Sequence, residues 1–195
     1  MIEFTTPNGS IQVKSSYFDL TCSEYARILE RPKDFDFVFS VLTGIPEDEI
    51  LTHDLSSVVD FISFLNESAR DLEPLDFITI NEKDYSGVNI WEDTWARKIT
   101  SDKLVRVIKS EEEFVEDKYI VPDLVELVAI YTTKQKKKFD DTKIKETRKL
   151  LDHMPVAEVY PFGLHLEKQL TDINQTERKL LKSEYTPEQI QAGIH

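Results

Sequence analysis

Residues 42–50 read LTGIPEDEI and contain the signals that end one helix and begin the next. Gly44 can adopt the left-handed backbone that closes many helices, and Pro46 suits a first helical turn because its missing N–H needs no partner there. The three carboxylates of residues 47–49 then fall in that first turn, where the helix dipole favours negative charge by about 0.3–1 kcal/mol each. The stretch therefore predicts a junction between two helices. A metal site at these carboxylates would need ligands from elsewhere, because no calcium-binding loop flanks them.

Upstream of this junction the sequence predicts a hairpin and two helices. Residues 1–6 and 11–14 flank an Asn-Gly pair, which accepts the positive φ of a tight turn between two strands. Residues 21–24 read TCSE, a capping box that marks the start of a helix. The next helix is expected over residues 34–43, where apolar residues recur at i, i+3, i+4 and i+7: Phe35, Val38, Phe39 and Leu42.

Downstream of the junction the pattern alternates between helix and strand. Apolar residues at helical spacing predict a largely buried helix over residues 55–65. A second hairpin is expected from residues 77–80 and 88–91. Thr100 or Ser101 can cap the helix that follows.

The last third of the chain is expected to be mainly helical. An acidic loop over residues 111–117 precedes helices over residues 124–131 and 141–153. A further helical stretch begins at Pro155, and we expect an interruption at residues 161–163, which include a proline and a glycine. A short final helix is expected after Thr186-Pro187.

This order of elements predicts a mainly helical α+β fold with two β-hairpins and two tandem subdomains. Residues 1–72 would form the first subdomain, residues 73–170 the second, and residues 171–195 a C-terminal helical arm. The same order of elements in both halves suggests a duplication, and an alignment keeps His53 in register with His153. Chance similarity between two amphipathic halves explains the likeness equally well.

Composition disfavours two classes of partner. The chain of 195 residues has 37 acidic residues against 24 basic ones and a formal net charge of −13. Such a surface repels nucleic acid and anionic membranes, so neither is expected as a partner. The single cysteine cannot form an internal disulfide, and we find no leader sequence and no run of 18 apolar residues. A soluble protein that stays in, or assembles from, the cytosol is expected.

The sequence contains no recognisable catalytic, cofactor or metal motif. The histidines show no zinc spacing, and five glycines form neither a phosphate-binding loop nor an esterase elbow. Cys22 lies in the first turn of a predicted helix, where a thiol can become reactive, but a small packing residue is the simpler interpretation. We therefore expect no enzyme, no catalytic residue, no bound cofactor and no metal.

Two further features favour packing or protein contacts over chemistry. Trp91 and Trp95 could stack on bases or anchor a partner, although packing in a hairpin or core accounts for them more simply. The lysine-rich residues 134–138 could touch phosphate, but a solvated loop or a contact with an acidic neighbour is the simpler interpretation.

Three stretches of the first 70 residues resemble a family of tailed-bacteriophage proteins. Residues 20–25 read LTCSEY, residues 39–50 read FSVLTGIPEDEI and residues 61–67 read FISFLNE. This combination is similar to that of tail assembly chaperones and small virion structural proteins. The resemblance implies a protein without catalytic residues that shields parts of a virion protein through helical grooves and acidic surfaces.

The resemblance implies other phage structural proteins as partners, in the host cytoplasm or in the virion, with an oligomer possible. The alternatives are a permanent connector-ring or packaged virion protein, an acidic regulatory binding protein and, least favoured, an enzyme with an unrecognised site. Apolar points of the C-terminal arm and one basic run are the expected partner-binding residues: Leu180, Leu181, Tyr185, Ile190, Lys136, Lys137 and Lys138.

Overall fold

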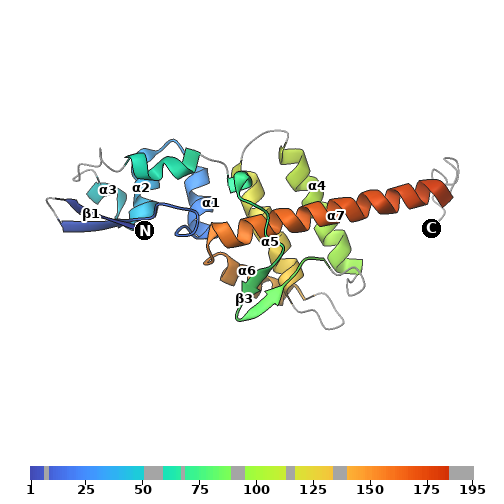
Figure 1. Cartoon of the computed structure of the whole chain (residues 1–195). Coiled ribbons are helices and arrows are strands. Elements are labelled where there is room, and N and C mark those ends of the chain that lie inside the picture. Colours follow the sequence, from blue (N-terminus) through green and yellow to red (C-terminus); the bar gives the residue numbers. More distant parts are fainter. Residues whose placement is uncertain are drawn as a thin grey trace.

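The fold is mainly helical with two small antiparallel hairpins, as expected for this α+β class (Figure 1). The computed structural model describes residues 1–6, 9–50, 59–66, 69–88, 95–112, 117–133 and 140–184. The strands are β1 (Ile2–Thr6), β2 (Gly9–Val13), β3 (Ile78–Ile80) and β4 (Lys83–Tyr85). The helices are α1 (Cys22–Glu30), α2 (Phe35–Thr43), α3 (Glu47–Ile50), α4 (Trp95–Glu112), α5 (Asp117–Thr132), α6 (Asp141–Leu151) and α7 (Val156–Glu184), with 3₁₀ helices η1 (Val59–Asn66) and η2 (Ala69–Asp71).

The first hairpin forms, although its second strand begins at Gly9, two residues earlier than expected. Strands β1 and β2 pair in antiparallel register, with Ile2 opposite Val13. On β2 the burial alternates, because Ile11 and Val13 are buried and Gln12 between them is exposed. The hairpin therefore uses one face of β2 to cover the core, as strand periodicity requires.

The capping box of α1 is also confirmed. The backbone N–H of Glu24 donates to Thr21 Oγ1 at 3.3 Å, and the N–H of Thr21 donates to Glu24 Oε2 at 3.0 Å. Two N–H groups that a helix start leaves without partners are thus satisfied by local side chains.

The predicted junction of residues 42–50 joins α2 to α3. Gly44 closes α2 in the left-handed conformation, with φ of 75°, and its N–H donates to the Ser40 carbonyl at 2.8 Å. The short helix α3 follows Pro46, with its three carboxylates in the first turn. The charges therefore lie where the helix dipole favours them.

The second hairpin is shorter than predicted and turns earlier. Strand β4 covers residues 83–85, whereas we expected the second strand at residues 88–91. That prediction was wrong for Val88, which belongs to no strand, and residues 89–91 lie outside the described ranges. The reason is a two-residue turn in which Asn81 and Glu82 both take positive φ, which pairs Ile80 with Lys83. Sequence favoured Gly87 as the turn residue, whereas Gly87 lies after β4.

Two helix predictions and one loop prediction need correction. The expected helix over residues 55–65 is a 3₁₀ helix where it is described, and Ile62, Phe64 and Leu65 are half-buried where we expected burial. Helix α4 begins at Trp95, so Ser101 lies inside the helix and does not cap its start. The acidic loop expected over residues 111–117 is shorter, because α4 extends to Glu112 and α5 begins at Asp117. The expected final helix after residue 186 lies outside the described ranges.

Ser101 serves the packing of α4 on α5 instead of capping. Its hydroxyl donates to the Arg97 carbonyl one turn earlier and lies 3.1 Å from the Tyr131 hydroxyl of α5. The buried Arg97 guanidinium donates to the Thr133 carbonyl at 3.2 Å, just beyond the end of α5. A cation at a helix C-terminus is favourable because the carbonyls there carry partial negative charge.

Helix α7 runs without interruption from Val156 to Glu184, although we expected a break at residues 161–163. Pro161 removes one backbone hydrogen bond, but its neighbours Tyr160 and Phe162 are both almost fully buried, at 1% exposed. A β-carbon on Gly163 would lie 3.2 Å from that of Leu124, so the glycine lets α7 approach α5 closely. Tertiary packing thus outweighs the local helix-breaking tendency.

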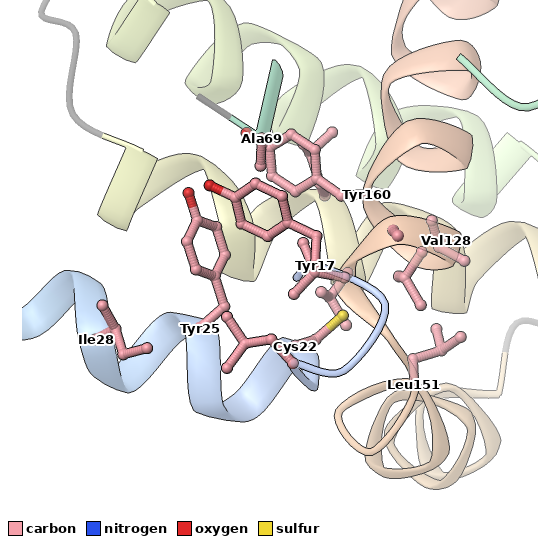
Figure 2. Close-up of a cluster of buried hydrophobic side chains, with 14 of the residues drawn as sticks. Tyr17, Cys22, Tyr25, Ile28, Ala69, Val128, Leu151 and Tyr160 are labelled. Carbon is pink, nitrogen blue, oxygen red and sulfur yellow. The ribbon is translucent and has the colours of Figure 1, made fainter. Parts of the chain in front are cut away.

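One hydrophobic core joins the two halves of the chain. Helix α5 packs against α1, α4, α6 and α7, and the buried residues form a single cluster (Figure 1). Figure 2 shows part of it, where Tyr17 and Cys22 from the N-terminal half meet Val128, Leu151 and Tyr160 from the C-terminal half.

The starts of α1 and α7 are bonded to each other. The N–H groups of Cys22 and Ser23 donate to the carbonyls of Met154 and Asp152, at 3.0 and 2.9 Å. In return, Val156 N–H donates to the Leu20 carbonyl at 2.8 Å. Each helix start therefore satisfies N–H groups of the other. The boundaries at residues 72 and 170, and the duplication, stay predictions, although residue 170 lies inside the continuous α7.

Candidate functional site

Helix α7 changes character at Leu170. Between Val156 and Leu170 most of its side chains are buried, whereas the described side chains after Leu170 are half-buried or exposed. We call residues 171–184 the α7 arm. At a rise of about 1.5 Å per residue, the α7 arm is about 21 Å long.

The α7 arm is tied to α4 by polar contacts. Asn174 donates to Asp102 at 2.9 Å, and Lys98 of α4 pairs with Glu177. Leu180 follows Glu177 by three residues and is 56% exposed. Surface ion pairs of this kind are worth at most about 1 kcal/mol, so the contacts orient the α7 arm more than they stabilise it.

The predicted partner-binding residues are distributed as follows. Leu180 lies on the α7 arm with an exposed side chain. Leu181 also belongs to α7, although its side chain lies outside the described part of the chain. The remaining predicted positions are outside the described ranges: Tyr185, Ile190, Lys136, Lys137 and Lys138.

A second feature of interest is formed where α2 and α3 begin. Arg31 pairs with Asp34 and, at 3.2 Å, with Glu47, and so joins the two helix starts. The Arg31 guanidinium and the Phe37 N–H hold the pKa of Asp34 below its usual range. Phe35, the next residue after Asp34, is 44% exposed. The centroid of its ring lies 5.0 Å from the centroid of the buried Phe39 ring.

We call this surface the acidic face. It consists of the exposed Phe35 and of the carboxylates at the starts of α2 and α3, two of which pair with Arg31: Asp34, Asp36, Glu47, Asp48 and Glu49. The helical spacing of apolar residues predicted that Phe35 belongs to the buried stripe of α2, but its side chain is exposed. The signal was its place as the first residue of the helix, between two aspartates.

Charge is divided unequally along the chain. Residues 1–88 contain 17 acidic and six basic residues, a net charge of −11, whereas residues 89–195 contain 20 and 18, a net charge of −2. Within the α7 arm, residues 178–182 read RKLLK and contain no acidic residue. Glu177 and Glu184 flank this run, and the whole α7 arm holds three acidic and three basic residues, so it has no net charge.

The cysteine and the described histidines form no reactive cluster. Cys22 is 3% exposed, and burial raises the pKa of its thiol to about 12, so the group is a neutral packing residue. His165 Nδ1 lies 3.5 Å from Asp76, which links α7 to the segment before β3, and His153 is exposed. His53 and His195 lie outside the described ranges.

The described residues contain neither a group of side chains placed to hold a metal ion nor a helix that could cross a membrane. In these ranges no group of three or more histidine, cysteine, aspartate or glutamate side chains is placed to hold a metal ion. Among the helices described, none combines the length and apolar character needed to cross a bilayer.

Comparison with known proteins adds no relative. No protein-family model, no curated protein and no solved structure matches the chain.

Proposed function

We propose that this chain is a non-catalytic protein of tailed-phage morphogenesis that binds other phage structural proteins through the α7 arm. The observation that carries the proposal is the continuation of α7 beyond the core, where Leu180 is exposed among charged residues. The resemblance of residues 1–70 to tail assembly chaperones and small virion proteins supplies the phage context.

The physical basis is recognition of a helix by a groove. A helix that presents a few apolar side chains from a polar surface binds when those side chains enter an apolar groove of the partner. Leu180 near the end of the α7 arm would provide such an anchor, and the acidic and basic residues around it would meet a polar rim. The protein would act in the host cytoplasm or as part of the virion.

The test is capture of phage structural proteins from infected cells with the tagged wild type, a Leu180→Asp variant and a Leu150→Asp control. Leu150 is 48% exposed on α6, so the control introduces the same charge at a matched surface leucine. We expect identified tail or head proteins to be retained by the wild type and the control, and lost from Leu180→Asp. Equal capture by all three variants would contradict the role of the α7 arm.

Mass spectrometry of purified particles distinguishes the two forms of the proposal. A transient assembly chaperone should be absent from finished particles. A connector-ring or packaged protein should be present in a fixed ratio to the other virion proteins.

The acidic face favours a second candidate, an acidic regulatory protein that binds a basic surface of a host protein. In that case the captured protein should come from the host. Binding should then be lost in an Asp48→Lys variant and retained in Leu180→Asp.

A further inference from the structure

The outer edge of β1 is open in the part of the chain that the structure describes. The first sheet consists of β1 and β2. Strand β2 packs on α2, where the N–H of Lys14 donates to the Leu42 carbonyl at 3.1 Å, whereas no second described strand pairs with β1. Figure 1 shows β1 at one end of the molecule. The edge is therefore a surface on which a partner strand can dock.

The register of the hairpin shows which backbone groups this edge offers. Only two residues separate the paired Thr6 and Gly9, and a turn this short is closed by a hydrogen-bonded pair. Hydrogen-bonded and non-hydrogen-bonded pairs then alternate along the antiparallel ladder. Every second residue of β1 thus directs its N–H and C=O groups to β2, whereas Glu3 and Thr5 direct theirs to the open edge.

We propose that two copies of the chain associate through this edge, with β1 of one copy antiparallel to β1 of the other across a two-fold axis. The two hairpins then form one continuous sheet. The inference goes beyond the proposed function, because it uses neither the α7 arm nor the acidic face.

The sequence of β1 favours pairing with a copy of itself. Residues 2–6 read IEFTT, and isoleucine, phenylalanine and threonine are typical of strands. Proteins commonly protect an exposed edge with lysine, proline or a β-bulge. Strand β1 contains neither residue type, and it pairs with β2 one residue for one residue, without a bulge. The edge therefore lacks the usual features that prevent self-pairing.

The residues of the edge select one register. With the axis at Phe4, Glu3 of each copy lies opposite Thr5 of the other, and each such pair can exchange both backbone hydrogen bonds. An axis at Glu3 would place the two glutamates opposite each other, which destabilises a sheet. An axis at Thr5 would bring Glu3 opposite Pro7, a residue that has no N–H to donate.

The hairpin carries no net charge that would repel its copy. Residues 1–14 contain one acidic and one basic side chain, Glu3 and Lys14. The whole chains have a net charge of −13 and repel each other at longer range. Salt screens that repulsion, so association through the neutral edge should strengthen as ionic strength rises. Binding of a basic strand from another protein would weaken instead.

The experiment measures the mass of the full chain by analytical ultracentrifugation from about 1 µM to about 1 mM, at low and at high salt. Thr5→Pro removes an outward N–H, and an edge strand tolerates proline at such a position, so the hairpin itself should be kept. Thr5→Val is the matched control, since it retains both the N–H and the preference for a strand. Circular dichroism verifies that each variant is folded.

A lysine variant tests the register. Thr5→Lys places an opposite charge across from Glu3 of the other copy. The control Thr142→Lys makes the same change of net charge at an exposed position of α6, outside the hairpin.

We expect the wild type and Thr5→Val to approach the mass of a dimer and to grow no further, because pairing uses the open edge of both copies. Thr5→Pro should associate at least about tenfold more weakly, since hydrogen bonds across the axis are lost. Thr5→Lys should associate about fivefold more tightly than Thr142→Lys. Wild-type association should be stronger at high salt.

A wild type that stays monomeric over the whole range would overturn the inference. A folded Thr5→Pro variant that associates as well as the wild type would place the contact elsewhere and would overturn it too. If Thr5→Pro does not fold, the two lysine variants still decide, because equal association of both contradicts the register at Phe4. Wild-type association that weakens with salt, or that continues beyond a dimer, would also contradict pairing through this edge.

Discussion

At the scale of single residues, burial decides the chemistry of Cys22. The position at the start of α1 would by itself lower a thiol pKa, because helix N-termini favour negative charge. In the fold the side chain belongs to the buried cluster of Figure 2, and burial raises its pKa to about 12. The environment therefore outweighs the helix dipole.

The first prediction concerns the reactivity of this thiol. We expect native protein to react with a disulfide reagent at neutral pH only through unfolding, because the thiol is both buried and protonated. Labelling followed by absorbance should thus be slow in buffer and fast in denaturant. Rapid labelling of one thiol in the native protein would contradict the burial of Cys22.

A second residue-scale prediction concerns Glu24 and pH. Partial burial opposes ionisation of this carboxyl, but hydrogen bonds from Lys14 and Thr21 outweigh it and hold the pKa of Glu24 below its ordinary value of 4.5. The carboxylate therefore stabilises the fold at pH values above 4.5, and this contribution is lost as pH falls through the lowered pKa.

We expect Glu24→Gln to lower the free energy of unfolding by about 1 kcal/mol at neutral pH, and this loss to shrink as the pH falls through the lowered pKa of Glu24. Urea denaturation at neutral pH and at acidic pH measures the difference. The exposed Glu30 at the other end of α1 provides the control, since Glu30→Gln should change stability little at either pH. A loss from Glu24→Gln that is equal at both pH values would contradict an ionic contribution.

At the scale of elements, local signals explain where helices begin and end. Asp34 and Asp140 accept hydrogen bonds from N–H groups in the first turns of α2 and α6, at 3.2 and 3.3 Å. Gly44 closes α2 with positive φ. Each of these contacts spans at most four residues, so each could be predicted from the sequence.

The prediction at this cap is that Gly44→Ala destabilises the protein by about 1 kcal/mol. A β-carbon at this position would have no atom within 4 Å, so the cost is conformational and not steric. Gly44→Asn should cost less, because asparagine tolerates the left-handed region better than alanine. Thermal denaturation of the three proteins tests this order, and an alanine variant as stable as the wild type would contradict it.

The α7 arm allows a prediction about truncation. Removal of residues 171–195 takes away polar contacts with α4 but leaves Leu166 and Leu170, which are buried, in place. We expect the shortened protein to fold with a loss of about 1 kcal/mol or less. Truncation after Gly163 removes both leucines and should prevent stable folding, as followed by circular dichroism. Unfolding of the first truncation would show that the α7 arm is part of the core.

At the scale of the whole molecule, the fold depends on contacts between distant segments. Residues 17–23 exchange backbone hydrogen bonds with residues 152–157, and α5 provides the centre against which both halves pack. A core shared in this way makes the two halves depend on each other for burial.

The last prediction follows from this dependence. Residues 1–72 expressed alone should lack cooperative thermal unfolding, because Cys22 and Ser23 lose their carbonyl partners and the face of α1 loses α5. Addition of residues 73–195 as a second fragment should recover a cooperative transition if the fragments reassociate. A cooperative transition in residues 1–72 alone would mean that this part folds independently.

Local sequence patterns were enough to establish the class of the fold, the first hairpin and the helix junction at residues 42–50. They sufficed because capping, positive φ and the alternation of apolar residues act over a few neighbouring positions. The same patterns did not reveal the turn at Asn81 and Glu82, the continuation of α7 through Pro161 or the exposure of Phe35. The turn and the exposed Phe35 are local features, and their weaker signals were outweighed by Gly87 and by the helical spacing of apolar residues. The continuation of α7 emerges only in the folded chain, because it depends on packing against α5, which is distant in the sequence. The placement of the acidic face and the α7 arm at opposite ends has the same origin, since the path of α7 across the shared core sets where each surface lies.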